Sequence, residues 1–355
     1  MKPNINLNHL LRSKKLYYAL AAVAIISVLP LFVRSEYVVG HVFTVMIIFA
    51  IYASSWNLLA YSGQGSLGHA AFLGIGGFAS ALLATRLGVP PIIGLFVGSL
   101  FSAGIGFLIG LACVRLKAWF LAMVTFGFSV IAVTIISQLD PYIGGMIGFA
   151  VPSIVPPTLP FYYATLAIAA VSIGAIYLVM RSKFGLAFKA IRENELEAKM
   201  VGINSAKYKL IAFVISTFFA GLAGGLYAQS QLFIQIRFFE PYYSFLPLIM
   251  SVIGGLSTIE GPLIGSVIIV FIDSYLPLAD RLLQPLTPFF PGVSSIGSPL
   301  GRAGLGLFLI VVIIFLPKGL TSLFHKAYDY LAPHLRKAYD YFVKETPKAK
   351  TDGKT

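Results

Sequence analysis

The feature that most constrains this chain is a long stretch without acidic residues. No Asp or Glu occurs between Glu36 and Asp140, and most of that stretch is apolar. It is far longer than a single buried core helix needs, and it would be costly to leave in water. Only 11% of the 355 residues are charged, against about 25% in soluble domains. The composition therefore excludes a soluble enzyme and a disordered protein.

The apolar runs are long enough to cross a membrane, since a helix needs about 20 apolar residues to span the hydrocarbon core. We expect ten spans, with a range of eight to eleven: 17–33, 37–60, 67–84, 90–114, 118–137, 161–180, 210–229, 242–256, 262–274 and 303–317. The third, eighth and ninth are short or rich in glycine, which favours broken or re-entrant helices. The predicted fold class is therefore all-α, a polytopic transmembrane helical bundle.

The basic residues indicate which way the bundle is oriented. A net charge of +13 suits a nucleic-acid binder, but most Lys and Arg gather in polar segments beside the apolar runs. Cytoplasmic loops of membrane proteins carry such an excess. With ten spans, all the strongly basic segments fall on one side. We therefore expect a multi-pass protein of a prokaryotic plasma (inner) membrane, with both termini in the cytoplasm and no nucleic-acid partner.

The same segments define the expected organisation of the chain. Residues 1–320 form a single transmembrane domain, which includes a long cytoplasmic loop at 181–209. Residues 321–355 form a basic cytoplasmic tail.

Motifs for catalysis are missing or fail in their context. Residues 63–68 match G-x-G-x-x-G, but no acid follows about 20 residues later, as a dinucleotide site requires. The sequence Gly353–Thr355 resembles part of a phosphate loop, but Lys348 replaces the required earlier glycine. Cys113 is the only cysteine, which excludes a cysteine metal cluster. We expect no catalytic residue, no metal and no cofactor, and a chain that does not itself hydrolyse ATP.

Two glycine-rich segments, 61–83 and 252–266, carry polar residues at membrane depth. A helix break there frees backbone groups, which are tolerated only against protein or a water-filled path. In transporters, half-helix N-termini at such breaks receive anionic groups of the substrate. The candidate pathway residues are Gln64, Ser66, His69, Ser257 and Thr258. The alternative is that they join neighbouring helices, and close helix packing is what we favour for the glycines of 219–228.

The polar segment 181–213 lies between two spans and favours a compact helix at the cytoplasmic face. Good helix formers fill its middle, and Gly202 fits a helix stop. Phe184, Phe188 and Ile191 have the spacing of one apolar edge, which suits a groove in a soluble partner. A solvated loop is the alternative. The candidate residues for coupling to an ATPase are Phe188, Ile191, Arg192, Glu193, Glu197 and Gly202.

Several stretches resemble a known family. They include YSGQGSLGHAAFLGIGGFASALLA, RSKFGLAFKAIRENELEAKMVGINSAKYKLIAFVISTFFAGLAGGLYA, VIGGLSTIEGPLIGS and LFLIVVIIFLPKGL. In order and spacing, from about residue 57 to residue 320, they are similar to the LivM-type permease of branched-chain amino acid ABC transporters. This is a hydrophobic amino acid uptake family. The resemblance implies three kinds of partner besides the lipid bilayer: a homologous second permease subunit, two cytoplasmic ABC ATPase subunits, and an extracytoplasmic substrate-binding protein that delivers the substrate.

The resemblance also implies a function. The chain would be the membrane-spanning permease subunit of an ATP-driven importer of branched-chain, hydrophobic amino acids, with ATP hydrolysis left to its partners. The ATPase would dock around 196–202, although Leu196 and Glu197 depart from the family's E-A-A pattern. A urea or short-chain amide permease is the alternative within this class. A stand-alone secondary carrier or channel is the alternative outside it, disfavoured because Asp273 is nearly isolated as a buried carboxylate.

Overall fold

The computed structural model describes residues between 24 and 321, with gaps. The described residues are 24–30, 32–33, 35–113, 116, 118–139, 144, 147–156, 158–283, 306, 310, 314 and 319–321. At 118 and 276–283 the description covers the backbone alone. Most of the predicted span 303–317 and of the predicted tail 321–355, and the first part of the predicted span 17–33, lie outside the described residues.

Helices make up nearly all of the described residues. In chain order the elements are the π-helix η1 (Val38–Phe43), α3 (Thr44–Tyr61), α4 (His69–Arg86), α5 (Pro91–Cys113), α6 (Ala118–Gln138), β1 (Phe149–Ala150), α8 (Leu159–Arg181), α9 (Lys183–Glu193), α10 (Glu195–Met200), α11 (Ser205–Gln231), β2 (Phe233–Ile234), the 3-10 helix η2 (Ile236–Phe239), α12 (Pro241–Gly254) and α13 (Gly261–Leu283). β1 and β2 form a short antiparallel pair in which Phe149 lies opposite Ile234.

Among the described residues, five helices are long and apolar enough to cross a membrane. They are Val38–Tyr61, Pro91–Cys113, Trp119–Gln138, Leu159–Arg181 and Ser205–Gln231. Each coincides with a predicted span, so the chain is an all-α, multi-pass membrane protein. The glycine-rich α4 and the shorter apolar segments of α12 and α13 do not meet the same standard of length and hydropathy. The five long helices do not by themselves reach the predicted total of ten spans.

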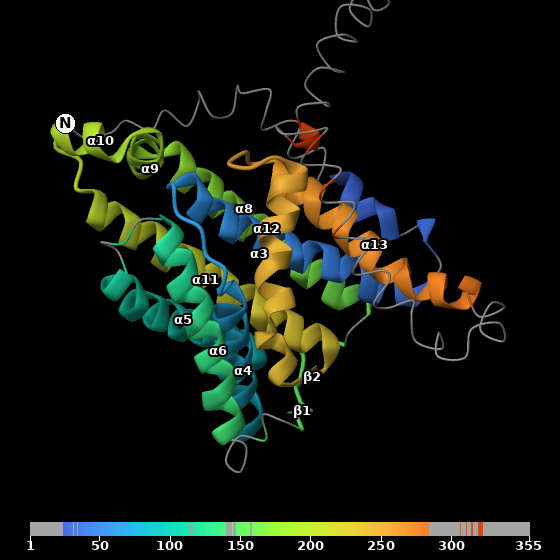
Figure 1. Cartoon of the computed structure of the whole chain (residues 1–355). Helices are drawn as coiled ribbons and strands as arrows, with labels where there is room; N and C mark the ends of the chain where they lie inside the picture. Colours follow the sequence, from blue (N-terminus) through green and yellow to red (C-terminus); the bar gives the residue numbers. More distant parts are fainter. Residues whose placement is uncertain are drawn as a thin grey trace, which may run out of the picture.

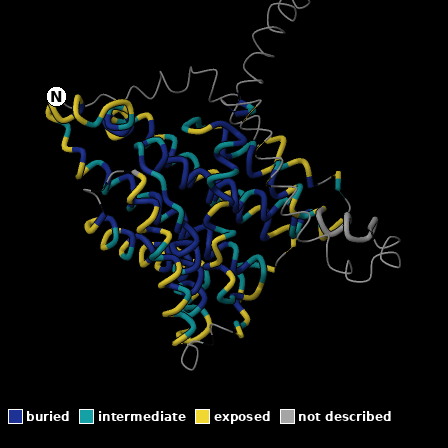
Figure 2. The backbone as a smooth tube through the Cα atoms, in the orientation of Figure 1, coloured by how far each residue is buried: buried dark blue, intermediate teal, exposed yellow. Residues whose placement is uncertain are grey.

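Burial separates central helices from peripheral ones. In their most apolar windows, α3 with η1 is 78% buried and α11 is 67% buried, whereas α6 is 28% buried. Figure 2 shows the buried residues gathered toward the middle of the bundle and the exposed ones on its outer faces. Large apolar side chains such as Leu100 on α5 and Trp119 on α6 are exposed. A surface of this kind suits lipid or another apolar protein surface and is unsuited to water.

Close helix contacts around α11 depend on glycine. α11 makes its most extensive contacts with α4 and α5. A Cβ added at Gly221 would lie 2.6 Å from the Ser102 Cβ, and one added at Gly224 would lie 1.9 Å from the Leu73 carbonyl oxygen. These helices can approach so closely only because the side chains are absent. The packing interpretation of the glycines in 219–228 is therefore confirmed.

The molecule has two distinct ends (Figure 1). α9 and α10 lie at one end, and the β1–β2 pair lies at the other. α11 begins directly after α10 and ends directly before β2, and its 27 residues correspond to about 40 Å of helix. It therefore connects the two ends. α5 runs antiparallel to it, since Gln229 near the end of α11 donates to the carbonyl of Pro91 at the start of α5.

Candidate functional site

The first glycine-rich segment interrupts a helical pass between Tyr61 and His69. α3 ends at Tyr61, and residues 62–68 run back along it before α4 begins. The return is fixed by two contacts. The Trp56 indole N–H donates to the Ser66 carbonyl oxygen at 2.8 Å, and Ser55 Oγ lies 3.1 Å from His69 Nε2. α4 therefore starts beside the middle of α3, well inside the bundle.

The start of α4 is already supplied with hydrogen-bond partners from other helices. Thr125 Oγ1 on α6 accepts the Leu67 backbone N–H at 3.2 Å. Ser244 Oγ on α12 accepts the Ala70 N–H at 3.1 Å. The first backbone N–H groups of a helix have no partner within it, so these hydroxyls do the capping. A Cβ added at Gly68 would lie 1.7 Å from the Thr125 carbonyl oxygen, so α6 packs directly against this break.

Ser66 and His69 are both fully buried at this break. The His69 ring lies 5.4 Å from the Tyr52 ring, centroid to centroid. Within the described part of the chain, Ser66 Oγ and His69 Nδ1 have no hydrogen-bond partner. Buried polar atoms are nearly always paired. These two atoms are therefore the places at this break where a water or a polar ligand group would be stabilised.

The second glycine-rich segment interrupts the chain between α12 and α13. Ser257 has a left-handed backbone, with φ of 60°. Thr258 Oγ1 donates to the Gly255 carbonyl at 2.7 Å and accepts the Gly261 N–H at 3.0 Å, which caps α13. Ser257 and Thr258 are partly exposed, and Leu256 beside them is half-exposed. This break thus lies closer to the surface of the subunit than the first one does.

Asn57 joins the second break to α3, a role that the sequence reasoning missed. Its Oδ1 accepts the Ser257 backbone N–H at 2.7 Å, and its Nδ2 donates to the Thr258 carbonyl at 2.5 Å. Asn57 is buried and lies one turn before the end of α3. A carboxamide inside an apolar run was the signal in the sequence, because a buried amide needs partners for both its ends.

The structure brings Ser66 and His69 together, and it joins Ser257 and Thr258 to the same helix through Asn57. Gln64 lies apart from them. Its Nε2 donates to Ser62 Oγ at 2.9 Å and to the Lys209 carbonyl oxygen of α11 at 3.0 Å. Gln64 thus ties the first break to the start of α11.

The polar segment after α8 forms two helices where the sequence favoured one. The division falls at Asn194, which has an extended backbone and is the cap of α10. Its Oδ1 accepts the backbone N–H groups of Leu196 at 3.0 Å and Glu197 at 3.3 Å, and its Nδ2 donates to the Glu197 carboxylate at 2.6 Å. α9 therefore ends before Asn194, and the capping by Asn194 starts α10 in a new direction. At the end of α10, Gly202 turns with φ of 83°.

Two residues of the apolar edge of α9, Phe188 and Ile191, face into the subunit, whereas Phe184 is 44% exposed. Phe188 is completely buried, Ile191 is nearly so, and both Phe184 and Phe188 lie against the Tyr208 ring of α11. Phe188 and Ile191 are therefore not free to fill a groove in a partner. Burial of these side chains holds α9 on the bundle, and any part that they take in coupling is through that positioning.

Arg192 and Glu193 lie where α9 meets the first break. The Arg192 guanidinium lies 5.4 Å from the centroid of the Tyr61 ring at the end of α3, and it pairs with Glu193 at 2.9 Å. The hydrogen bond and charge of Arg192 lower the pKa of the Glu193 carboxyl. A Cβ added at Gly63 would lie 3.0 Å from the Arg192 Cα. α9 is thus in contact with the start of the break.

Glu195 binds two lysines, one on each side of the turn after α10. It accepts from Lys199 at 3.0 Å and from Lys209 at 2.5 Å, and the Lys209 side chain is almost wholly buried. Burial raises the pKa of Glu195, but the hydrogen bonds from Lys209 and Lys199 outweigh it, so that the pKa is lowered. The ion pair fixes α10 to the beginning of α11.

Apolar helices interrupted by polar, glycine-rich breaks define a multi-pass membrane protein of the transporter class. The family model described as "branched-chain amino acid transport system / permease component" matches residues 38–316. The chain therefore belongs to this permease family, and the resemblance to LivM-type permeases is confirmed.

Individual relatives agree with this assignment. The high-affinity branched-chain amino acid transport system permease protein LivM of Salmonella typhimurium is 29% identical over 260 residues, which is 64% of this chain and 61% of that protein. The probable branched-chain amino acid transport permease protein LivH of Methanocaldococcus jannaschii is 26% identical over 214 residues, 56% of this chain and 67% of that one. The guanosine ABC transporter permease protein NupQ of Bacillus subtilis is 32% identical over 69 residues, 19% and 22% of the two chains.

The chain spans about three fifths of the length of the LivM protein that it matches. No solved structure gives a significant match.

Proposed function

We propose that this chain is the membrane-spanning permease subunit of an ATP-driven ABC importer that translocates branched-chain amino acids. The observation that carries the proposal is the family match over residues 38–316. The LivM and LivH relatives, whose names specify branched-chain amino acid transport, support this substrate class. The chain itself is not an enzyme in this proposal, and ATP hydrolysis belongs to partner subunits.

The proposed assembly contains a homologous second permease, two cytoplasmic ATPase subunits and an extracytoplasmic binding protein. It lies in the inner membrane of a prokaryote, with ten spans and both chain termini in the cytoplasm. Residues 1–320 act as one permease domain with 321–355 as its tail. The end of the molecule that bears α9 and α10 is the cytoplasmic end, because its basic residues fit the positive-inside rule.

The proposed pathway runs beside the two breaks. Ser66 and His69 each carry a buried polar atom without a partner among the described residues, which favours contact with a polar group or water on the route. Ser257 and Thr258 lie on the more exposed break, and Gln64 ties the first break to α11. These residues line or support the pathway, and their polarity at this depth supports that role.

The proposed coupling element is the loop 181–209. Four of its candidate residues are at least partly exposed: Arg192, Glu193, Glu197 and Gly202. Phe188 and Ile191 are buried and hold α9 against the bundle. A helix pair fixed to the ends of α3 and α11 can transmit a push from an ATPase to the first break, since its contacts with them are direct.

Uptake of labelled solutes tests the proposal. The chain would be expressed with a homologous permease, ATPase subunits and a binding protein from the same genome, in cells lacking their own uptake systems. Uptake of leucine, isoleucine and valine is expected to depend on ATP and on every partner. Uptake of urea or a short amide, or of guanosine as the NupQ match suggests, would change the substrate class. Transport by this chain alone, without ATPase subunits, would contradict the proposal and favour a carrier or channel.

A further inference from the structure

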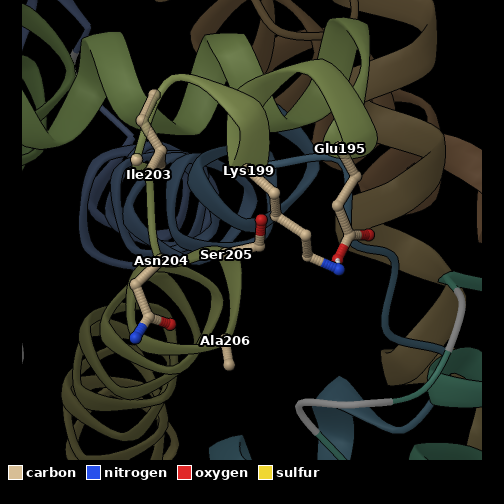
Figure 3. Close-up of a pocket in the computed structure, with 7 residues that line it drawn as sticks. Glu195, Lys199, Ile203, Asn204, Ser205 and Ala206 are labelled. Atoms are coloured by element: carbon tan, nitrogen blue, oxygen red, sulfur yellow. Dashed lines mark ion pairs between the residues drawn. The ribbon is translucent and has the colours of Figure 1, made fainter.

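A pocket of about 470 Å³ lies between α10 and the start of α11 (Figure 3). It is lined by Glu195, Lys199, Gly202, Ile203, Asn204, Ser205 and Ala206. Its volume is in the range of sites that bind small molecules or single partner side chains.

The lining combines the first turn of α11 with one hydroxyl that has no hydrogen-bond partner among the described residues. Asn204 caps α11 by accepting the Lys207 N–H, but the first turn of a helix has further N–H groups that need partners, and its dipole favours an anion there. Ser205 is 1% exposed, and its Oγ has no hydrogen-bond partner within the described residues. In Figure 3 its hydroxyl points toward the side of the pocket where Lys199 lies. The pocket therefore offers an anion both a helix N-terminus and a buried hydroxyl.

The charges around the pocket have the matching sign. Glu195 is the one acid in the lining, and it is shared between Lys199 and the buried Lys209. Two ammonium groups therefore face one carboxylate, which leaves a positive excess beside the positive end of α11. A second carboxylate entering the pocket would be attracted to Lys199, the more exposed of the two lysines.

The surroundings of the pocket favour a protein partner over a free anion. Leu196 is 70% exposed, Met200 85% and Val201 76%. Leu196 and Met200 each follow a lining residue of α10, so they lie about 100° further round the helix, directly beside the pocket. Large apolar side chains around a polar pocket resemble the centre of a protein interface, where an apolar ring keeps water from an ion pair. A small anion would leave them uncovered.

We propose that this pocket receives an Asp or Glu side chain of the ATPase subunit, while Leu196, Met200 and Val201 pack on the surface around that side chain. The inference rests on the proposed function, which supplies the ATPase. It assigns the contact to α10 and the N-terminus of α11, in place of the apolar edge of α9, of which Phe188 and Ile191 face inward.

The same pocket is linked to the transmembrane core. Glu195 holds the Lys209 ammonium at 2.5 Å, and the Lys209 backbone carbonyl accepts from Gln64 of the first break at 3.0 Å. If a partner carboxylate binds Lys199, Glu195 loses one of its two ion pairs and keeps only the one with Lys209. The ATPase would therefore act on α11 and the first break through a single buried lysine.

Charge changes in the assembled complex test this inference. The permease would be purified with its neighbouring permease and ATPase subunits, and the dissociation constant of the ATPase measured across salt concentrations. Lys199→Glu is expected to weaken association about tenfold or more, since a like-charge contact replaces an attractive one. Lys199→Gln should weaken it less and reduce its salt dependence. Arg86→Glu is the control of matched charge change, because Arg86 is exposed at the end of α4 and lies outside the loop 181–209 and the pocket, and it should bind normally.

Ser205→Ala separates binding from folding. Loss of this buried hydroxyl should leave the melting temperature of the permease alone unchanged or higher, since no hydrogen bond among the described residues is lost. Association with the ATPase should nevertheless weaken several-fold. A lower melting temperature with unchanged association would overturn the inference, because Ser205 would then serve only the fold.

Two further measurements distinguish the occupants. A single cysteine introduced by Met200→Cys, with Cys113→Ala, should react with a water-soluble maleimide in membranes and be protected only when the ATPase is bound. Protection without the ATPase would assign the surface to the bilayer and overturn the inference. The second measurement is the melting temperature of the permease alone in inorganic phosphate. A rise that is lost in Lys199→Gln would assign the pocket to a free anion and would also overturn the inference.

Failure of this inference and failure of the proposed function give different results. If Lys199→Glu and Ser205→Ala bind the ATPase normally while Glu197→Arg does not, the loop 181–209 contacts the ATPase but the pocket does not, since Glu197 is exposed and does not line the pocket. If the unmodified permease associates with no ATPase, the proposed function itself fails.

Discussion

The two helix breaks look alike in sequence but differ in how the structure holds them. Residues 62–68 lie within the bundle, with Ser66 and His69 fully buried and with α3, α6, α11 and α12 each supplying a hydrogen bond. Residues 255–260 lie partly exposed and are tied to α3 by one side chain, Asn57. A break held from several sides is expected to be more rigid than one that is tied to α3 by a single amide and packs against Gly319. We therefore expect the first break to move only together with the helices that hold it, whereas the second can move by itself.

The largest effect is expected from Gly68→Ala. The added Cβ would lie 1.7 Å from the Thr125 carbonyl oxygen, so that α6 must shift. Overpacking of this severity costs about 3 kcal/mol, and the yield of folded protein should fall sharply. Gly65→Ala is the matched control in the same break, because nothing lies within 4 Å of its added Cβ. Equal melting temperatures for the two variants would contradict a rigid first break.

Asn57→Leu should disconnect the second break while leaving the first in place. It leaves the Ser257 N–H and the Thr258 carbonyl without their partner, at a cost of about 2 kcal/mol. Asn57→Asp keeps an acceptor for Ser257 but sets a buried carboxylate oxygen against the Thr258 carbonyl, so it should cost more. Limited proteolysis and thermal melting measure this, and we expect faster cleavage near 255–260. If cleavage moved to 62–68 instead, Asn57 would be stabilising the other break.

His69→Leu tests whether the first break also serves the pathway. The substitution loses the contact with Ser55 Oγ, and it removes the unpaired Nδ1. We expect uptake to fall several-fold while the amount of assembled protein falls less. Uptake at the normal rate would show that His69 only holds α3 and α4 together. Ser55→Ala serves as a comparison, because it breaks the same contact without removing the ring.

A smaller effect is expected from Thr258→Val, which keeps the shape of the side chain and loses its hydroxyl. The Gly255 carbonyl and the Gly261 N–H each lose a partner, at a cost of about 1 kcal/mol because the site is partly exposed to water. If the second break moves during transport, the turnover rate should change more than the melting temperature. If only the melting temperature changed, the second break would serve the stability of the fold and not the turnover.

The smallest effect concerns acid stability at the cytoplasmic end. Glu195 has a lowered pKa in the folded protein, below its ordinary value of 4.5. Its stabilising effect is therefore fully present above pH 4.5 and is lost as the pH falls through the lowered pKa. Melting temperatures measured from pH 7 to pH 3 should decline in this acid range, and Glu195→Gln should make part of the decline disappear. An identical pH profile in the variant would mean that the two lysine contacts do not stabilise the fold.

The sequence by itself determined the membrane class, the positions of the long helices and the family. Long apolar runs leave few alternatives, because a backbone in lipid must satisfy its hydrogen bonds within each helix. The two breaks were also visible, since glycine and polar residues interrupt these runs at 61–83 and 252–266. Such features are local, and local patterns are enough to predict them.

Only the tertiary structure decided what the side chains of these elements contact. Spacing placed Phe184, Phe188 and Ile191 on one edge of α9. It did not show that Phe188 and Ile191 would be buried against the subunit while Phe184 stays exposed. Asn57 meets Thr258 across 201 residues of sequence. Contacts over such separations depend on how the helices pack. For the same reason, no local pattern marked the unpaired hydroxyl of Ser205 beside α10.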